Sequence, residues 1–178
     1  MQFIFAISIC IFLIKSTISE KNHWPAFYPC DYGYTYEKTL KQCYKLYAGG
    51  DLTFDLAEAK CNEDDAHLVS IHSEKENEYV TALAYTNGGA SSGCQWINAW
   101  IGLHYLNEAW RWTDETPLDY TKWGCNLPAK GKKTCAFTNT AHASEPSCGD
   151  WYGLWDNHHY CNESRAFVIC KQHPKLFG

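Results

Sequence analysis

The amino-acid sequence predicts a single α+β domain with two helices early, strands late and one long loop region. Apolar residues recur at helical spacing over 54–64 and again over 74–86. From residue 96 onward, short apolar runs alternate with irregular polar stretches, of which the longest spans 113–134. No internal repeat or linker divides the 178 residues, so one domain is expected.

The first half of the domain carries local signals for each element. Tyrosines alternate with small or polar residues over 32–36, a period of two that predicts a strand. Thr53 is the expected N-cap of the first helix. Ser73 and Glu76 form a capping box before the second helix, in which the glutamate would reach back toward the serine. The other expected strands are 44–47, 67–71, 99–103, 110–112, 135–137, 153–156 and 165–170.

The amino terminus predicts export. Residues 3–14 form an uncharged apolar run. This run is too short to cross ~30 Å of hydrocarbon, because a spanning helix takes about 20 residues. Thr17 and Ser19 are suitably placed for cleavage before Glu20. We therefore expect residues 1–19 to be a secretory signal peptide, with a membrane anchor as the alternative, and no later segment to span a bilayer.

Composition and motifs exclude several classes of function. The formal net charge of −5 gives no electrostatic basis for binding nucleic acid or an anionic membrane. The sequence has no nucleophile elbow, His-Glu-x-x-His motif or phosphate-binding loop, so we expect no enzymatic activity. His158 and His159 suggest zinc, but adjacent strand residues point apart and no third ligand has suitable spacing. Exposed loop histidines are the better interpretation.

The cysteines predict a disulfide framework. Of the ten cysteines, Cys10 belongs to the leader, which leaves nine in the exported chain. Their scattered spacing, without a Cys-x-x-Cys pair, argues against a zinc module. Because the number is odd, one thiol is expected to be free or to bond another chain. The cysteines are residues 30, 43, 61, 94, 125, 135, 148, 161 and 170.

Taken in order, these features resemble the C-type lectin-like domain. The resemblance rests on Cys30 and Cys43, a helix ending at Cys61, HLVSIHSEKENEYV at 67–80, WIGL at 100–103, Trp110, and cysteines 135, 161 and 170. It covers about 28–172, which leaves 20–27 as a lead-in and 173–178 as a short tail. The resemblance implies a secreted, extracellular binding module of the long form, a disulfide-stapled fold with small antiparallel sheets.

The family's disulfide bridges can be carried over residue by residue. The resemblance implies Cys30–Cys43, Cys61–Cys170 and Cys135–Cys161, with Cys148 as the rival of Cys135 in the third bridge. Cys125 and Cys148 both lie in the loop-rich half, so we expect them to pair, although spacing alone does not determine connectivity. Cys94 would then be the odd residue and could link a disulfide-bonded dimer.

The long loop carries the family's usual calcium site in a degenerate form. In sugar-binding members, side-chain oxygens flanking a loop proline and on a Trp-Asn-Asp strand coordinate the ion, which takes about 6–8 oxygen ligands. Here the flanking residues are Leu127 and Ala129, which offer no side-chain oxygen. The strand reads Trp-Asp-Asn, so Asp156 and Asn157 remain as candidate metal ligands with acid and amide exchanged. We expect weak calcium binding or none, and a loop proline, Pro128, kept for shape as a cis peptide.

Two functions follow from the resemblance and its departures. The first is recognition of a glycan or glycoprotein through the long-loop face, with weak or no calcium dependence. The alternative is calcium-independent binding of a protein surface, which the missing oxygens favour. Aromatic rings can contact either a sugar or a protein surface. Separately, Asn162 begins an N-glycosylation sequon. The candidate ligand-binding residues are Asn126, Trp151, Tyr152, Asp156 and Asn157.

Overall fold

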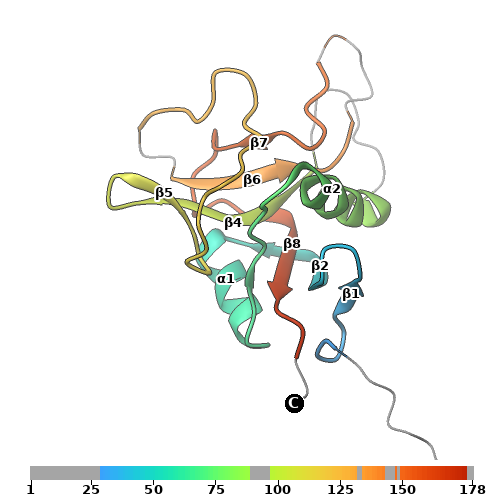
Figure 1. Ribbon diagram of the computed structural model, residues 1–178. Coiled ribbons are helices and arrows are strands. Elements are labelled where there is room, and N and C mark those ends of the chain that lie inside the picture. Colours follow the sequence, from blue (N-terminus) through green and yellow to red (C-terminus); the bar gives the residue numbers. More distant parts are fainter. Residues whose placement is uncertain (1–28, 89–96, 132–133, 143–146, 148, 176–178) are drawn as a thin grey trace, which may run out of the picture.

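The computed structural model describes residues 29–88, 97–131, 134–142, 147 and 149–175. The expected signal peptide and lead-in, together with Cys94 and Cys148, lie outside the described residues. The α+β fold class is confirmed, because within these ranges two helices pack beside an eight-stranded sheet (Figure 1). Within the described residues, no helix is long and apolar enough to cross a membrane.

The strands join into one sheet rather than several separate ones. Its order is β1-β2-β8-β4-β6-β7, with β3 paired to β8 and β5 paired to β4. Every pair is antiparallel except β4 with β8, which links the two halves of the sheet. The elements are β1 (Thr35–Glu37), β2 (Gln42–Leu52), α1 (Phe54–Asn62), β3 (His67–Leu68), α2 (Glu74–Gly88), β4 (Asn98–Leu106), β5 (Ala109–Trp112), β6 (Cys135–Asn139), β7 (Trp155–Asp156) and β8 (Arg165–Gln172).

Both helices begin where the sequence predicts, but their caps differ in detail. Thr53 takes an extended backbone at the N-cap of α1, yet its side chain makes no capping hydrogen bond. At α2, the Glu76 amide donates to the Ser73 hydroxyl over 3.1 Å, as expected of a capping box. The Glu76 carboxylate instead accepts from the amide of His72, over 2.8 Å, because Tyr44 and Lys171 hold its other oxygen in the core.

Among the described residues, three disulfides staple the fold, and all three are bridges that the resemblance implies. Cys30–Cys43 closes the hairpin of β1 and β2, Cys61–Cys170 ties the end of α1 to β8, and Cys135–Cys161 ties β6 to the segment after β7. The second bridge closes a loop with a sequence separation of 109 residues. In the chain-entropy account, a closure of this length stabilises the fold by about 4–5 kcal/mol.

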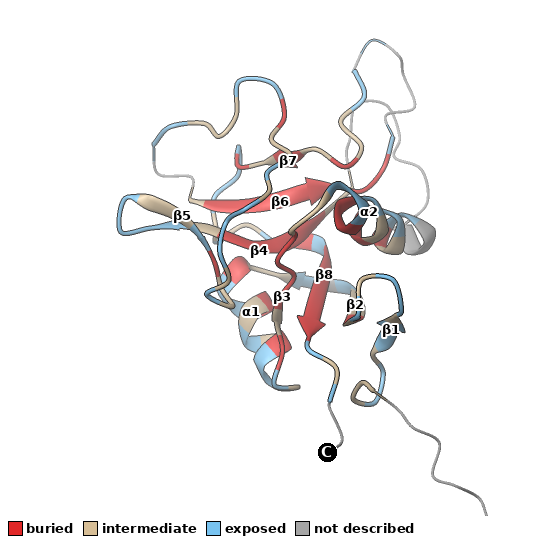
Figure 2. Cartoon of the chain, viewed as in Figure 1, coloured by how far each residue is buried: buried red, intermediate tan, exposed pale blue. Residues whose placement is uncertain are grey.

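The core lies between the sheet and the helices, and its buried residues concentrate on β4, β6 and β8 (Figure 2). Trp100, Trp112 and Trp155 are fully buried, so these rings are structural. The Trp155 indole donates to the Asn77 side chain of α2 over 2.7 Å, which satisfies its buried N–H. The long loop after β5 and the segments around β7 gather at one end of the molecule, away from β1 (Figure 1).

Candidate functional site

The loop of residues 122–131 lies against β7 through main-chain hydrogen bonds. The Gly124 amide donates to the Trp155 carbonyl over 2.9 Å, and the Trp155 amide donates to the Lys122 carbonyl over 2.8 Å. The Leu127–Pro128 peptide bond is cis, as the sequence predicts. The loop backbone is therefore positioned by β7 itself.

Asn157 fastens the far side of this loop. Its side chain is fully buried. The carboxamide oxygen accepts from the Ala129 amide over 2.7 Å, and the carboxamide nitrogen donates to the Ala129 carbonyl over 2.9 Å. Both ends of one amide thus bond the residue after Pro128.

Asp156 faces a different partner. One carboxylate oxygen accepts from the His158 amide over 2.6 Å and lies 2.9 Å from Nδ1 of the His158 ring. Asp156 and Asn157, the two candidate metal ligands, therefore do not converge. In the part of the chain that the structure describes, no group of three or more His, Cys, Asp or Glu residues could hold a metal ion. Since Leu127 and Ala129 add no side-chain oxygen, the donor set does not fit calcium.

The remaining candidate residues divide between the surface and the loop interior. Asn126 is exposed at the tip of the loop. Trp151 is partly buried and packs on the loop, because a Cβ on Gly124 would overlap its ring. Only glycine fits at that position, and this close approach holds the 149–153 turn against the loop. Tyr152 turns to the other side, toward helix α2.

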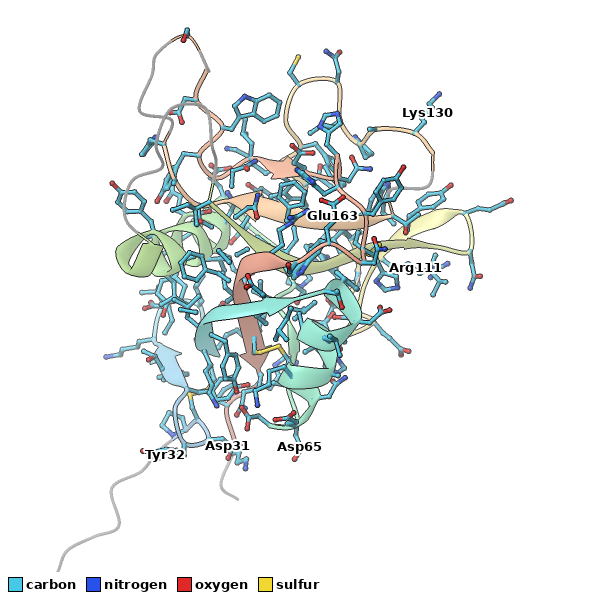
Figure 3. All side chains as sticks on the ribbon, turned by 180° about the vertical axis from the view of Figure 1, so that it is seen from behind. Asp31, Tyr32, Asp65, Arg111, Lys130 and Glu163 are labelled. Atoms are coloured by element: carbon cyan, nitrogen blue, oxygen red, sulfur yellow. A yellow bond between two sulfur atoms is a disulfide. The ribbon has the colours of Figure 1, made fainter. Side chains whose placement is uncertain are left out.

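Two exposed histidines with carboxylate partners follow β7, and the sequence analysis assigned them no role in the site. The side chains of His158 and His159 are 53% and 46% exposed, in accord with the expectation of exposed loop histidines. Nδ1 of His159 lies 2.6 Å from Glu163. The amide of Tyr160 also donates to this carboxylate, and this bond with the neighbouring His159 holds the pKa of Glu163 below its ordinary value. Lys130 projects outward from the loop, and Glu163 lies below it (Figure 3).

One predicted disulfide is wrong. Cys125 is a free, exposed thiol on the loop, so it does not pair with Cys148 as expected. Both residues belong to the loop-rich half of the sequence, but a bridge requires Cα atoms within about 7 Å, which shared loop content does not ensure. The expected dimer through Cys94 stays a prediction, because that residue lies outside the described ranges.

A polar network under the long loop links a serine, a histidine and an aspartate through successive side-chain contacts. Nε2 of His72 lies 3.2 Å from the Ser70 hydroxyl, and Nδ1 lies 2.7 Å from Asp119. Ser70 is fully buried, however, and its hydroxyl donates to Asp114 over 2.5 Å. A buried hydroxyl that gives its proton to a carboxylate cannot meet a substrate, so the network is structural.

Asp114 is the centre of this network. Burial acts to raise its pKa, but the hydroxyls of Ser70 and Thr116 donate to it and hold the pKa below its ordinary value. The two bonds anchor the start of the long loop to the core as long as the carboxylate is ionised.

Comparisons with known proteins agree with this architecture. The family described as Lectin C-type domain matches residues 50–172. Layilin of Mus musculus is 30% identical over 149 residues, which cover 76% of this chain and 38% of layilin, so the chain spans well under half of that relative. Dromaiocalcin-1 of Dromaius novaehollandiae is 34% identical over 131 residues, 72% of this chain and 82% of that protein. Among solved structures, a calcium-independent type II antifreeze protein is 29% identical with a TM-score of 0.62, covering 82% of this chain and 95% of that one.

Proposed function

The chain belongs to the C-type lectin domain family, and from this premise we propose that it is a secreted binding protein that recognises glycans through its long-loop face without bound calcium. Members of this family are generally non-enzymatic binding modules. The proposed face comprises the exposed residues of the 122–131 loop and of the 156–163 segment.

The proposal that recognition needs no calcium rests on the two hydrogen bonds between Asn157 and Ala129. In calcium-binding relatives, the ion joins the proline loop to the strand below it. Here the fully buried side chain of Asn157 makes that connection, through two part-buried hydrogen bonds that low local polarity strengthens. The 29% identical antifreeze protein described as calcium-independent supports the same conclusion.

Glycan recognition without a metal needs side chains that bond hydroxyl groups. The proposed face offers the amide of Asn126, the ammonium of Lys130 and the imidazole of His158, all on exposed residues. The ring of Tyr160, 49% exposed, adds a flat surface for the C–H face of a sugar. The pattern of several hydrogen-bonding groups beside one aromatic ring suits a neutral or acidic saccharide.

A glycan array run first with calcium and then with chelator tests this function. We expect binding to a defined set of glycans that survives chelation and that falls at least tenfold in Tyr160→Ala. Tyr105→Ala removes a similarly exposed tyrosine, 42% accessible, at the end of β4, and serves as the matched control. Binding that disappears with the chelator would contradict the role given to Asn157, whereas silence on all glycans would contradict glycan recognition.

A protein ligand is the second candidate function, and a groove beside the β4–β5 hairpin favours it. The groove has a volume of about 820 Å³ and is lined by Trp110, Arg111, Pro117 and other residues of the hairpin and following loop. Leu106 and Leu118, which are 49% and 37% exposed, also line it. The lining combines these apolar side chains with polar groups, a mixture that is typical of protein interfaces.

A further inference from the structure

Three aromatic rings meet on the surface beside the long-loop face, one from α2 and two from the connection between β6 and β7. His142, which follows β6, stacks on Tyr152 with ring centroids 4.2 Å apart and planes inclined by 19°. Tyr85 of α2 stands edge-on to both, with centroid separations of 6.0 Å to His142 and 5.7 Å to Tyr152. We call these three residues the ring cluster.

Asp150 orients the ring cluster. The same carboxylate oxygen, Oδ1, accepts from the main-chain amide of Tyr152 over 3.0 Å and lies 3.1 Å from Nδ1 of His142. The Tyr152 amide, followed by the His142 ring, holds the pKa of Asp150 below its ordinary value. The carboxylate is therefore ionised at neutral pH, and its second oxygen has no partner among the described residues.

Packing alone does not account for this arrangement. Rings that only fasten a turn to a helix are expected to be covered, yet the side chains of His142 and Asp150 are 53% and 68% exposed. Tyr85 is 38% exposed as well. An exposed carboxylate held by two bonds beside exposed rings is preorganised, so a ligand would meet it with little loss of conformational entropy.

We propose that the ring cluster and Asp150 form a metal-free subsite for one neutral pyranose residue of a glycan. The C–H face of the sugar packs against the exposed surfaces of His142 and Tyr85, where the π-electrons attract polarised C–H groups. Two neighbouring hydroxyls of the sugar donate to Asp150, a charge-assisted interaction that replaces the calcium coordination of other family members. The inference rests on the proposed glycan-binding function and adds a second contact region beside the face proposed for it.

The test uses nuclear magnetic resonance on the exported chain with labelled aromatic side chains. Glucose, galactose, mannose and N-acetylglucosamine are titrated separately in the presence of chelator. We expect one or more of these sugars to shift the ring signals of His142 and Tyr85. Tyr85→Phe, which keeps the ring, should bind within about twofold of the parent, whereas Tyr85→Ala and Asp150→Asn should each weaken binding about tenfold or more.

Thermal melting of each variant separates lost binding from lost folding, and Tyr105→Ala again provides the control ring. Sugars that shift signals of the 122–131 and 156–163 segments but leave His142 and Tyr85 unchanged would overturn the subsite while preserving glycan recognition. Equal affinity of folded Tyr85→Ala and the parent would do the same. If no sugar shifts any signal and the glycan array is silent, the proposed function fails and the subsite fails with it.

Discussion

Replacing Asn157 by alanine removes the side-chain connection between the residue after β7 and the proline loop. The substitution deletes two part-buried hydrogen bonds to Ala129. Each is worth about 0.5–1.5 kcal/mol net, and a buried partner left unsatisfied costs about 1–3 kcal/mol. Ala129 is only partly buried, so water can reach some of its freed groups, and we expect a loss of about 2–3 kcal/mol in unfolding free energy. In a domain of this size, that corresponds to a fall of roughly 5–10 °C in melting temperature.

Urea denaturation followed by tryptophan fluorescence measures the loss, with an unchanged m-value expected because the fold is retained. Asn62→Ala, an exposed amide at the end of α1, is the control and should change stability by less than about 0.5 kcal/mol. Millimolar calcium should leave the melting temperature of the parent chain unchanged, since an ion that binds the folded state would raise it. The reasoning is refuted if Asn157→Ala is as stable as the parent and calcium raises the melting temperature of either.

Three further perturbations test the framework below the loop. Replacing both Cys61 and Cys170 by serine opens the 109-residue loop and should cost about 4–5 kcal/mol in denaturant unfolding; a loss below about 1 kcal/mol would contradict the entropic account. Because the folded pKa of Asp114 is depressed, its stabilisation is present above about pH 4 and lost as pH falls. Asp114→Asn should therefore flatten the acid side of the stability profile, and an unchanged profile would exclude this role. Lys171→Met leaves Glu76 buried without its ammonium partner at 2.7 Å and should lower the free energy of unfolding by about 3–5 kcal/mol. Adding Glu76→Gln should recover much of this loss, because the unpaired charge is then gone. Equal stability of the single and double variants would argue against the pair.

Local chemistry explains what could be predicted from the sequence. Capping preferences predicted helix starts at Thr53 and Ser73, and the structure has both helices there, although only the Ser73 side chain makes a capping hydrogen bond. The missing oxygens at Leu127 and Ala129 are a property of the residues in any fold. The poor fit to calcium was therefore predictable, because coordination requires electron pairs that these side chains lack.

Tertiary packing decided the details that matter for ligands. Whether Asn157 would face an ion, solvent or Ala129 depends on how β7 packs against the loop. This packing cannot be predicted from the residues next to Asn157 in the sequence. The expected pairing of Cys125 failed for the same reason.

The ring cluster is a further example, since Tyr85 of α2 meets His142 and Tyr152 of the β6–β7 connection, far from it in the sequence. Capping, strand alternation and ligand chemistry are set by bonds and contacts within a few residues, so the sequence by itself determined the fold class and the loss of oxygen donors, whereas the framework bridges followed from the resemblance to the C-type lectin-like domain. Contacts between side chains that are distant in the sequence depend on the packing of the whole domain. Only the tertiary structure could therefore decide which groups hold the loop and which are exposed to a ligand at the surface.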